Sequence, residues 1–182
     1  MTQDWRIAWS YNVIDKYKHL SVDQIKAEVK KHSLPFAVCM QQIQGDFNFG
    51  TLVRNANAFG AEQVFYFGKK KWDRRGAQGT YHYTDVSYIE QLSELTNLGY
   101  TLVAVDNIEG AIPFDKFVWP EKPLLIFGEE GTGISSEVLE VCKNVVYIPQ
   151  TGSVRSVNVG CASAIIMYHL MAHLSERNNH EM

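Results

Sequence analysis

Five polar residues in three short segments have side chains that could position a substrate and stabilise charge during a reaction. Asn48 and Arg54 belong to one segment, Glu130 to a second, and Ser156 and Asn158 to a third. Serine and asparagine can hydrogen-bond a substrate, and a carboxylate or a guanidinium can stabilise a charge of opposite sign. A free arginine is protonated at ordinary pH, so orientation and charge stabilisation suit Arg54 better than a role as a base.

Three predicted strands each run directly into a polar loop, and two of these loops contain glycine. One strand ends at Val105, one runs into Gly128, and one ends at Ile148. In an open parallel sheet, ligands bind beyond the carboxyl ends of the strands. Backbone groups in such loops can hold an adenine and a ribose without side-chain bulk, so we expect a small-molecule site there.

Other common site classes do not fit these residues. The stretch from Gly128 to Gly133 lacks the Lys-Ser/Thr ending of a phosphate-binding loop, and no Gly-x-Gly-x-x-Gly follows the first strand. His169 and His173 lie four residues apart, but no glutamate beside the first histidine or third ligand accompanies them. We therefore expect no metal site.

Alternating apolar runs and helical patterns predict an α/β fold with a parallel sheet covered by helices on both faces. Strands are predicted at 36–40, 63–67, 100–105, 124–127 and 145–148, and helices at 22–31, 50–59, 135–142 and from 157 onward. The segment 87–98 is predicted to form a short strand and then a helix. The spacing of Ser21 and Gln24 predicts a capping box for the first helix. Residues 1–34 are interpreted as an appendage, and 35–182 as the main domain.

The last helix is predicted to begin at Val157, with Ser156 as its cap and Asn158 two residues inside it. Apolar residues recur at helical spacing from Val157 to Tyr168. The stretch from Ile165 to Leu174 carries more apolar residues than one buried face needs, which indicates a contact with a second copy of the chain.

Composition is that of an ordinary soluble domain. The chain has 182 residues and a net charge of −3, without an apolar run long enough to span a membrane or the pattern of a secretory signal. A cytoplasmic location is the resulting expectation. Cys39, Cys142 and Cys161 are odd in number, far apart and near apolar stretches, which predicts buried free thiols.

The densest basic stretch follows the second predicted strand. It contains Lys69, Lys70, Lys71, Arg74 and Arg75, together with Trp72. Cations beside a stacking ring suit RNA, although a solvated charge run is the plainer alternative. Positive residues before and in the first helix, Arg6, Lys16, Lys18 and His19 among them, are interpreted as part of a covering helix, with an RNA-contacting arm as the alternative.

The three polar segments resemble, in order, the three motifs of the SpoU/TrmH branch of the SPOUT methyltransferases. The segment 48–60 resembles motif one, 125–135 motif two and 148–164 motif three. The resemblance covers roughly residues 35 to 174. It implies a SPOUT fold with a C-terminal trefoil knot, and S-adenosylmethionine held at the loop ends by Val105, Gly128, Ile148, Ser156 and Val157.

The activity that the resemblance implies is methyl transfer to a ribose 2′-hydroxyl of tRNA or rRNA, without a metal. Arg54 matches the motif-one arginine that holds or deprotonates the hydroxyl, and Asn48 would fix the loop beside it. Glu130 matches the motif-two glutamate, and Ser156 and Asn158 match motif three. The resemblance also implies a homodimer through the knot region, with Arg54 completing a site across the interface.

Two alternatives stay open at this point. One is a SPOUT-type RNA-binding protein without catalysis, which loss of Arg54 or of the Ser156/Asn158 pair would favour. The other is methylation of an RNA base, although the residues of motifs one and three favour ribose. Which RNA and which nucleotide are modified, and whether an accessory protein is needed, do not follow from the sequence.

Overall fold

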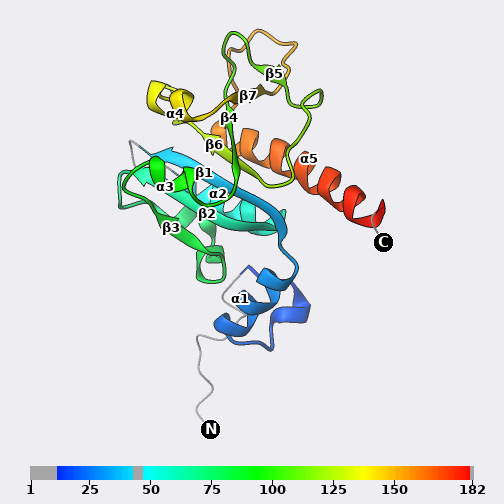
Figure 1. The fold of residues 1–182 in the computed structure, drawn as a ribbon. Coiled ribbons are helices and arrows are strands. Elements are labelled where there is room, and N and C mark those ends of the chain that lie inside the picture. The colour runs from blue at the N-terminus through cyan, green and yellow to red at the C-terminus, as the bar shows by residue number, and fades with distance from the viewer. Residues whose placement is uncertain (1–11, 43–46, 181–182) are drawn as a thin grey trace.

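The computed structural model describes residues 12–42 and 47–180. Its centre is a seven-stranded, all-parallel sheet with the strand order β3-β2-β1-β6-β4-β7-β5 (Figure 1). The strands are β1 (Leu34–Gln42), β2 (Ala61–Gly68), β3 (Val86–Tyr88), β4 (Thr101–Val105), β5 (Ile112–Pro113), β6 (Pro123–Phe127) and β7 (Asn144–Tyr147). The predicted parallel α/β sheet is confirmed.

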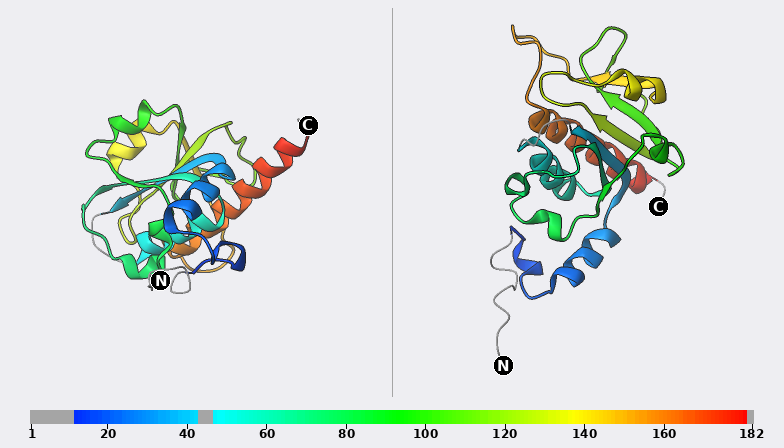
Figure 2. Two further views of the ribbon diagram at one scale, coloured as in Figure 1. Left: turned by 90° about the horizontal axis from the view of Figure 1, so that it is seen from below. Right: turned by 90° about the vertical axis from the view of Figure 1, so that its left-hand side faces the viewer.

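Helices cover both faces of the sheet (Figure 2). They are α1 (Val22–Lys31), α2 (Asn48–Ala58), α3 (Ser93–Thr96), α4 (Ser136–Val141) and α5 (Val159–His180), with short 3-10 turns η1 (Asp15–Tyr17), η2 (Arg74–Ala77) and η3 (Thr80–His82). Alternate residues of β1 point to opposite faces, as strand geometry requires. Val38 and Met40 pack with α2 and α5, while Ala37 and Cys39 pack with α3 and α4.

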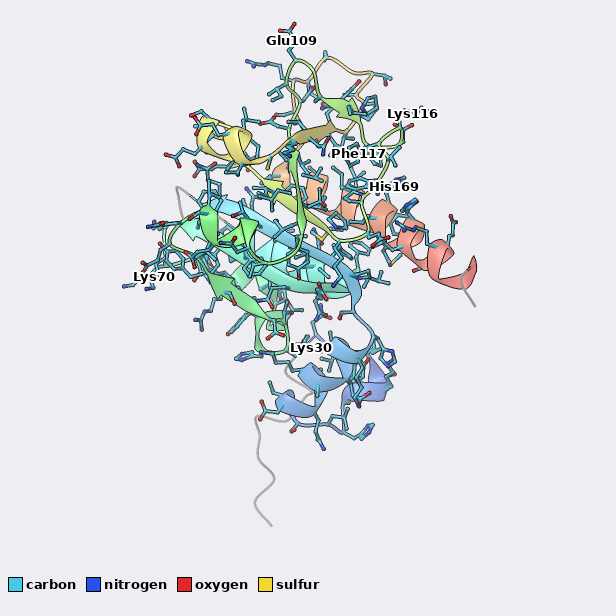
Figure 3. All side chains as sticks on the ribbon, in the orientation of Figure 1. Lys30, Lys70, Glu109, Lys116, Phe117 and His169 are labelled. Carbon is cyan, nitrogen blue, oxygen red and sulfur yellow. The ribbon has the colours of Figure 1, made fainter. Side chains whose placement is uncertain are left out.

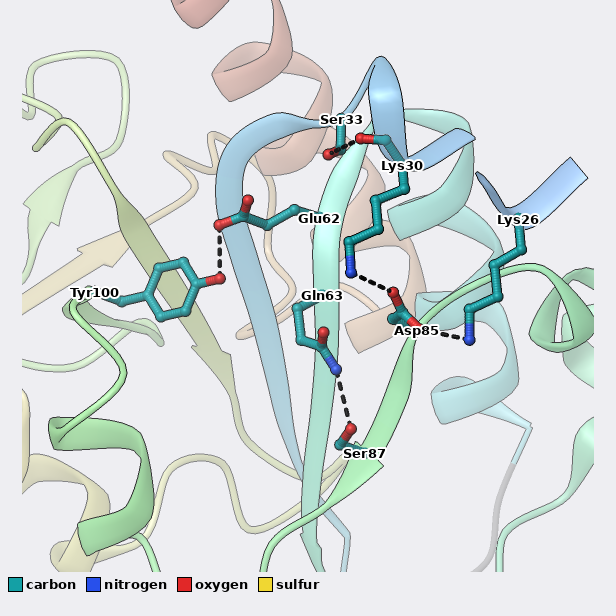
Figure 4. A network of polar contacts seen from close by, with 8 residues as sticks. All are labelled: Lys26, Lys30, Ser33, Glu62, Gln63, Asp85, Ser87 and Tyr100. Carbon is teal, nitrogen blue, oxygen red and sulfur yellow. Dashed lines mark hydrogen bonds and ion pairs between the residues drawn. The ribbon is translucent and has the colours of Figure 1, made fainter. Parts of the chain in front are cut away.

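The first helix lies at the β3 edge of the sheet and is tied to it by charge. Ser21 accepts a hydrogen bond from the Gln24 backbone and Gln24 returns one, so the predicted capping box is confirmed. Lys26 and Lys30 of α1 both contact the Asp85 carboxylate, which precedes β3 (Figure 4). This contact joins α1 to the segment that leads into β3. The predicted charge at Arg6 lies outside the described residues.

The start of the last helix differs from the prediction. The chain from Thr151 to Asn158 is not helical, and α5 begins at Val159. Asn158 caps the helix, because its Oδ1 accepts from the Cys161 backbone N–H at 3.2 Å and its carbonyl accepts from that of Ala162. The predictions of a Ser156 cap and of Asn158 inside the helix are therefore wrong.

The residues that α5 buries also differ from the apolar residues whose spacing predicted this helix. Gly160, Ser163, Ile166, Met167, Leu170 and Leu174 are buried. Cys161, Ile165 and Tyr168 are exposed instead. Cys161 therefore contradicts the expectation of three buried thiols, whereas Cys39 and Cys142 fulfil it. Burial raises the pKa of both the Cys39 and the Cys142 thiols.

Smaller departures occur in two connections. The helix predicted at the end of the segment 87–98 is a single turn, α3, and the connection 111–123 contributes the short strand β5 to the sheet. Trp119 of this loop is buried. No helix among the described residues could span a membrane. The trefoil knot stays a prediction.

Candidate active site

A cavity of about 640 Å³ opens beyond the carboxyl ends of β4, β6 and β7. These are the three strand ends at which the sequence predicts a small-molecule site. The residues proposed to hold the cofactor all line this cavity: Val105, Gly128, Ile148, Ser156 and Val157. The structure thus brings together five residues that lie as far as 52 positions apart in the chain.

The loop after β6 is folded back tightly on itself. Glu129 and Gly133 form an antiparallel bridge through two backbone hydrogen bonds. A side chain at Gly128 would collide with the backbone of Gly133, so this approach requires glycine. Asp106, after β4, accepts the backbone N–H of Ile134 at 2.8 Å and holds the far side of the loop. This part of the cavity wall is therefore preorganised backbone.

Three predicted catalytic residues meet in one hydrogen-bonded cluster beside the cavity. The Asn48 Nδ2 donates to Glu130 Oε2 at 2.5 Å. The Asn158 Nδ2 lies 3.2 and 3.1 Å from the two Glu130 oxygens and 3.0 Å from Asn48 Oδ1. Asn48 begins α2, Glu130 lies in the loop after β6, and Asn158 caps α5. Two amides thus fix the orientation of one carboxylate.

Asn55 is a structural part of this site that the sequence analysis did not single out. Its Nδ2 donates to the Gly160 carbonyl at 2.9 Å and lies 3.0 Å from Ser163 Oγ. A side chain at Gly160 would press against Thr51, so α2 and α5 approach closely at this point. Asn55 therefore fixes the position of α2 relative to α5, and with it that of Asn48 relative to Asn158. Its signal was present, because it follows Arg54 directly in the first polar segment.

Arg54 does not belong to this cluster within one copy of the chain. It is exposed, and it is not among the described residues that line the cavity. Helix geometry puts it about 120° around α2 from Asn48 and about 9 Å further along the axis. Burial raises the pKa of Tyr83 to about 12, and the nearby charge of Arg54 opposes this rise. Asn48 contacts Glu130 and Asn158, and the expectation that it fixes the chain beside Arg54 stays a prediction.

Ser156 and Val157 lie in the non-helical segment before α5. Both are exposed and line the cavity, which leaves them accessible to a ligand. The neighbouring Arg155 carbonyl accepts a hydrogen bond from Asn107 Nδ2 at 3.2 Å. This bond joins the loop after β4 to the segment before α5, and both segments line the cavity.

Cations of the basic stretch after β2 lie over aromatic rings of the stretch and of the segments that follow it. The Arg74 guanidinium lies 5.0 Å from the Tyr81 ring and 5.8 Å from the Trp72 ring, and Lys70 lies 5.1 Å from the Tyr88 ring. Arg75 pairs with Asp73, and this contact lowers the pKa of Asp73. Lys69, Lys70, Lys71, Arg74 and Arg75 are all exposed. They form a surface that combines cations with rings.

Glycine allows a close contact between this surface and α2, the helix of the first polar segment. A side chain at Gly50 in α2 would lie 2.9 Å from Gly76 Cα and 2.8 Å from the Ala77 nitrogen. The α2 helix can therefore pack directly on η2, which carries Arg74 and Arg75. The contact between α2 and η2 therefore fixes Arg74 and Arg75 relative to Asn48.

No group of three or more metal-ligating side chains occurs within residues 12–42 and 47–180. His169 faces the segment 111–123, with its ring 4.8 Å from that of Phe114 at a right angle. Desolvation lowers the pKa of His169, and the charge of His173 adds to this effect. Figure 3 shows His169 close to Phe117 and far from Lys70. His169 thus belongs to a packing contact away from the basic stretch.

Comparison with known proteins gives consistent matches. The model of the SpoU rRNA methylase family matches residues 35–168. The tRNA (guanosine(18)-2′-O)-methyltransferase of Aquifex aeolicus (strain VF5) is 25% identical over 175 residues, which are 92% of this chain and 81% of that protein. The equally named enzyme of Escherichia coli (strain K12) is 27% identical over 138 residues, 72% of this chain and 60% of that protein.

Solved structures share the fold. The crystal structure of the A. aeolicus TrmH/SpoU tRNA modifying enzyme superposes with a TM-score of 0.75 at 22% identity, over 86% of this chain and 84% of that one. The SpoU methyltransferase AviRb of Streptomyces viridochromogenes, in complex with AdoMet, gives 0.69 at 23% identity, over 77% and 58%. The resemblance read from the three polar segments is confirmed, and the chain belongs to the SpoU rRNA methylase family.

Proposed function

We infer that this chain is an S-adenosylmethionine-dependent RNA 2′-O-ribose methyltransferase that acts on tRNA or rRNA. The observation that carries this inference is the Asn48–Glu130–Asn158 cluster beside the cavity at the ends of β4, β6 and β7. Family membership and the methyltransferase relatives supply the reaction class.

The residues of the cavity fit the cofactor. Pockets of roughly 300–1,000 Å³ hold ligands of this size, and the cavity lies within that range. Its walls combine apolar side chains, such as Val105 and Ile148, with the backbone of the loop 128–133. Gln150 adds a buried oxygen that lacks a partner among the described residues. When bound, S-adenosylmethionine supplies a methyl group that is already activated by its sulfonium charge.

The chain then has to orient the acceptor hydroxyl and stabilise charge. We assign to Glu130 the stabilisation of positive charge at the reacting end of the cavity, with Asn48 and Asn158 holding its carboxylate. Ser156 is placed to hydrogen-bond the cofactor or the acceptor. Arg54 orients the 2′-hydroxyl and stabilises the oxygen as its proton leaves, which is an electrostatic role.

A homodimer would bring Arg54 to the cavity. Ile165 is 42% exposed and Tyr168 59% exposed on the outer side of α5, and Cys161 is exposed beside them. We name these three residues the outer α5 face. Large apolar side chains that share one exposed face favour contact with a second copy. In this arrangement Arg54 of one subunit serves the cavity of the other, in the region predicted to form the knot.

We propose that RNA lies across the cationic surface formed by Lys69, Lys70, Lys71, Arg74 and Arg75. Exposed cations would contact phosphates, and the rings of Trp72 and Tyr81 offer stacking surfaces. Residues 1–34 lie outside the family match and are proposed to be an appendage to the catalytic domain of 35–182. The cytoplasm is the proposed location, where tRNA and rRNA would be substrates.

The test is transfer of a tritiated methyl group from the donor into bulk tRNA and rRNA, followed by nuclease digestion. Label on ribose is expected, and mapping of 2′-O-methylation in cells with and without the protein would identify the nucleotide. Absence of label from every RNA would favour a binding protein without catalysis. Label on a base would leave the family assignment standing and overturn the ribose assignment.

A further inference from the structure

We propose that Gln150 recognises the 6-amino group of the adenine ring of the cofactor. This assignment rests on the proposed function, because it takes the cavity to be the S-adenosylmethionine site. It adds a residue that determines ligand specificity through its side chain, at a site where most of the proposed contacts are backbone or apolar.

The motivating observation is a buried oxygen without a partner. Gln150 lines the cavity in the loop after β7, and its Oε1 is buried with no hydrogen-bond partner in the part of the chain that the structure describes. Leaving a buried acceptor unpaired is unfavourable, and such groups in folded proteins call for a partner. A ligand N–H group that enters the cavity would supply this partner.

Two carboxylates that line the cavity are already hydrogen-bonded. Asp106 accepts backbone N–H groups on both oxygens, from Asn107 at 2.7 Å and from Ile134 at 2.8 Å. Glu130 is held by two side-chain amides. The Gln150 oxygen is thus a buried acceptor that protein contacts within the described residues leave open.

Sheet order indicates which end of the cofactor reaches Gln150. Glu130 follows β6 and Gln150 follows β7, and β4 lies between these strands. Two strand spacings separate the two loops by about 10 Å at the sheet edge. Glu130 is therefore at the reacting end, and Gln150 is at some distance from it.

The lining around Gln150 suits a purine better than the charged amino-acid end of the cofactor. Tyr147, Ile148 and Val159 line the same cavity. A flat, apolar ring fits such surfaces, whereas the ammonium group would be better placed near the acidic loops after β4 and β6. Adenine carries its N–H donors on the 6-amino group, which matches an acceptor oxygen.

The experiment compares two ligands that differ in this group alone: S-adenosylhomocysteine and its analogue with hydrogen in place of the 6-amino group. Calorimetry measures the Kd of each for the wild type, Gln150→Met and Gln150→Glu. The wild type should bind the amino ligand about tenfold more tightly, as expected for one hydrogen bond to a buried group. Gln150→Met should bind both equally, and Gln150→Glu, which keeps an acceptor, should retain the preference.

Gln91→Met is the matched control, because Gln91 is exposed and lies outside the cavity. Thermal unfolding of each variant shows whether it is folded. Equal binding of the two ligands by the wild type, or a preference that survives in Gln150→Met, overturns the assignment while the proposed function stands. If the wild type binds neither ligand at millimolar concentration, the proposed function itself fails.

A third ligand without the α-amino group completes the test. Loss of discrimination against that ligand in Gln150→Met would place the amide at the amino-acid end and overturn the adenine assignment.

Discussion

Asn158 and Glu130 are joined by side-chain hydrogen bonds of 3.2 and 3.1 Å across 28 residues of chain. Asn158 uses its Nδ2 for this contact and for Asn48, while its Oδ1 accepts from the Cys161 backbone at the start of α5. One side chain therefore caps a helix and orients a carboxylate. The two tasks use different atoms, so substitutions can separate them.

Asn158→Ala should lose both the cap and the Glu130 contact. Loss of an N-cap costs about 1 kcal/mol, which corresponds to about 2–4 °C in Tm for a chain of this size. Methyl transfer should fall together with stability. Asn158→Asp keeps an acceptor for the cap but places a second carboxylate beside Glu130, so it should keep the cap and still lose transfer.

Thermal unfolding and the tritium assay, applied to both variants, check this prediction. Asn97→Ala is the control, since Asn97 is exposed and does not line the cavity. Full transfer activity in Asn158→Asp would show that the orientation of Glu130 by Asn158 does not matter for the reaction.

Arg54→Ala should abolish transfer while donor binding stays nearly unchanged, because Arg54 does not line the cavity. Loss of one group that stabilises charge in a transition state typically lowers kcat by about 10²–10³. Calorimetry with S-adenosylhomocysteine and single-turnover transfer separate binding from chemistry. Arg54→Lys keeps the charge and tests whether the planar guanidinium is needed.

Mixed dimers can test whether Arg54 acts across an interface. Gly128→Val should block the cavity, because a side chain there collides with Gly133, yet it leaves Arg54 in place. Each of Arg54→Ala and Gly128→Val should be inactive alone. Mixing them should restore activity, since one intact Arg54 can then serve one intact cavity. No recovery in a verified heterodimer would place Arg54 and its cavity in the same subunit.

Ile165→Glu should shift the chain from dimer to monomer, because it places a charge on the outer α5 face. Light scattering should give a mass near the 20.7 kDa of one chain for this variant and twice that for the wild type. Val118→Glu is the control, as Val118 is 88% exposed on the segment 111–123, away from that face. A wild type that is monomeric at micromolar concentration would contradict the dimer and the mixed-dimer mechanism together.

Sequence reasoning located the strand ends and the cavity residues well, because continuous apolar runs and the glycine loops are local signals. It failed at Asn158, where the local pattern could not show that the segment 151–158 is held in a non-helical course by Asn107 and the cavity wall. Gln150 and Asn55 were missed for a similar reason. Their roles depend on partners more than 100 residues away, or on a cavity that exists only in the fold.

Replacing Lys69, Lys70, Arg74 and Arg75 together by Ala should weaken RNA binding and flatten its salt dependence. Each lost phosphate contact should lower the slope of log K against log salt by about 0.7–0.9. Arg75 should contribute less than Arg74, because it is already paired with Asp73. Saturating RNA should restore most of the rate.

Filter binding of RNA over a range of salt concentrations measures this effect. A variant with Lys116 and Lys122 changed to Ala is the control, since both are exposed and Lys116 lies on the opposite side of the molecule from Lys70 (Figure 3). An unchanged slope in the loop variant would move the RNA surface elsewhere, and the basic residues of α1 would be examined next.

Asp85 should make the attachment of α1 dependent on pH. Partial burial of Asp85 favours a higher pKa, but the hydrogen bond and charge of Lys26, followed by Lys30, outweigh it and lower the pKa from 3.8. Because the folded-state pKa is depressed, the stabilisation is present above the unfolded pKa and is lost as pH falls through the folded one. Asp85→Asn should thus cost up to about 1 kcal/mol at pH 7, as for a solvent-accessible ion pair, and nothing in strong acid.

Hydrogen exchange of the α1 amides should be faster in Asp85→Asn than in the wild type at neutral pH, whereas Asp115→Asn, the control, should leave it unchanged. Equal exchange in wild type and Asp85→Asn at pH 7 would show that the two lysine contacts do not hold α1 to the sheet.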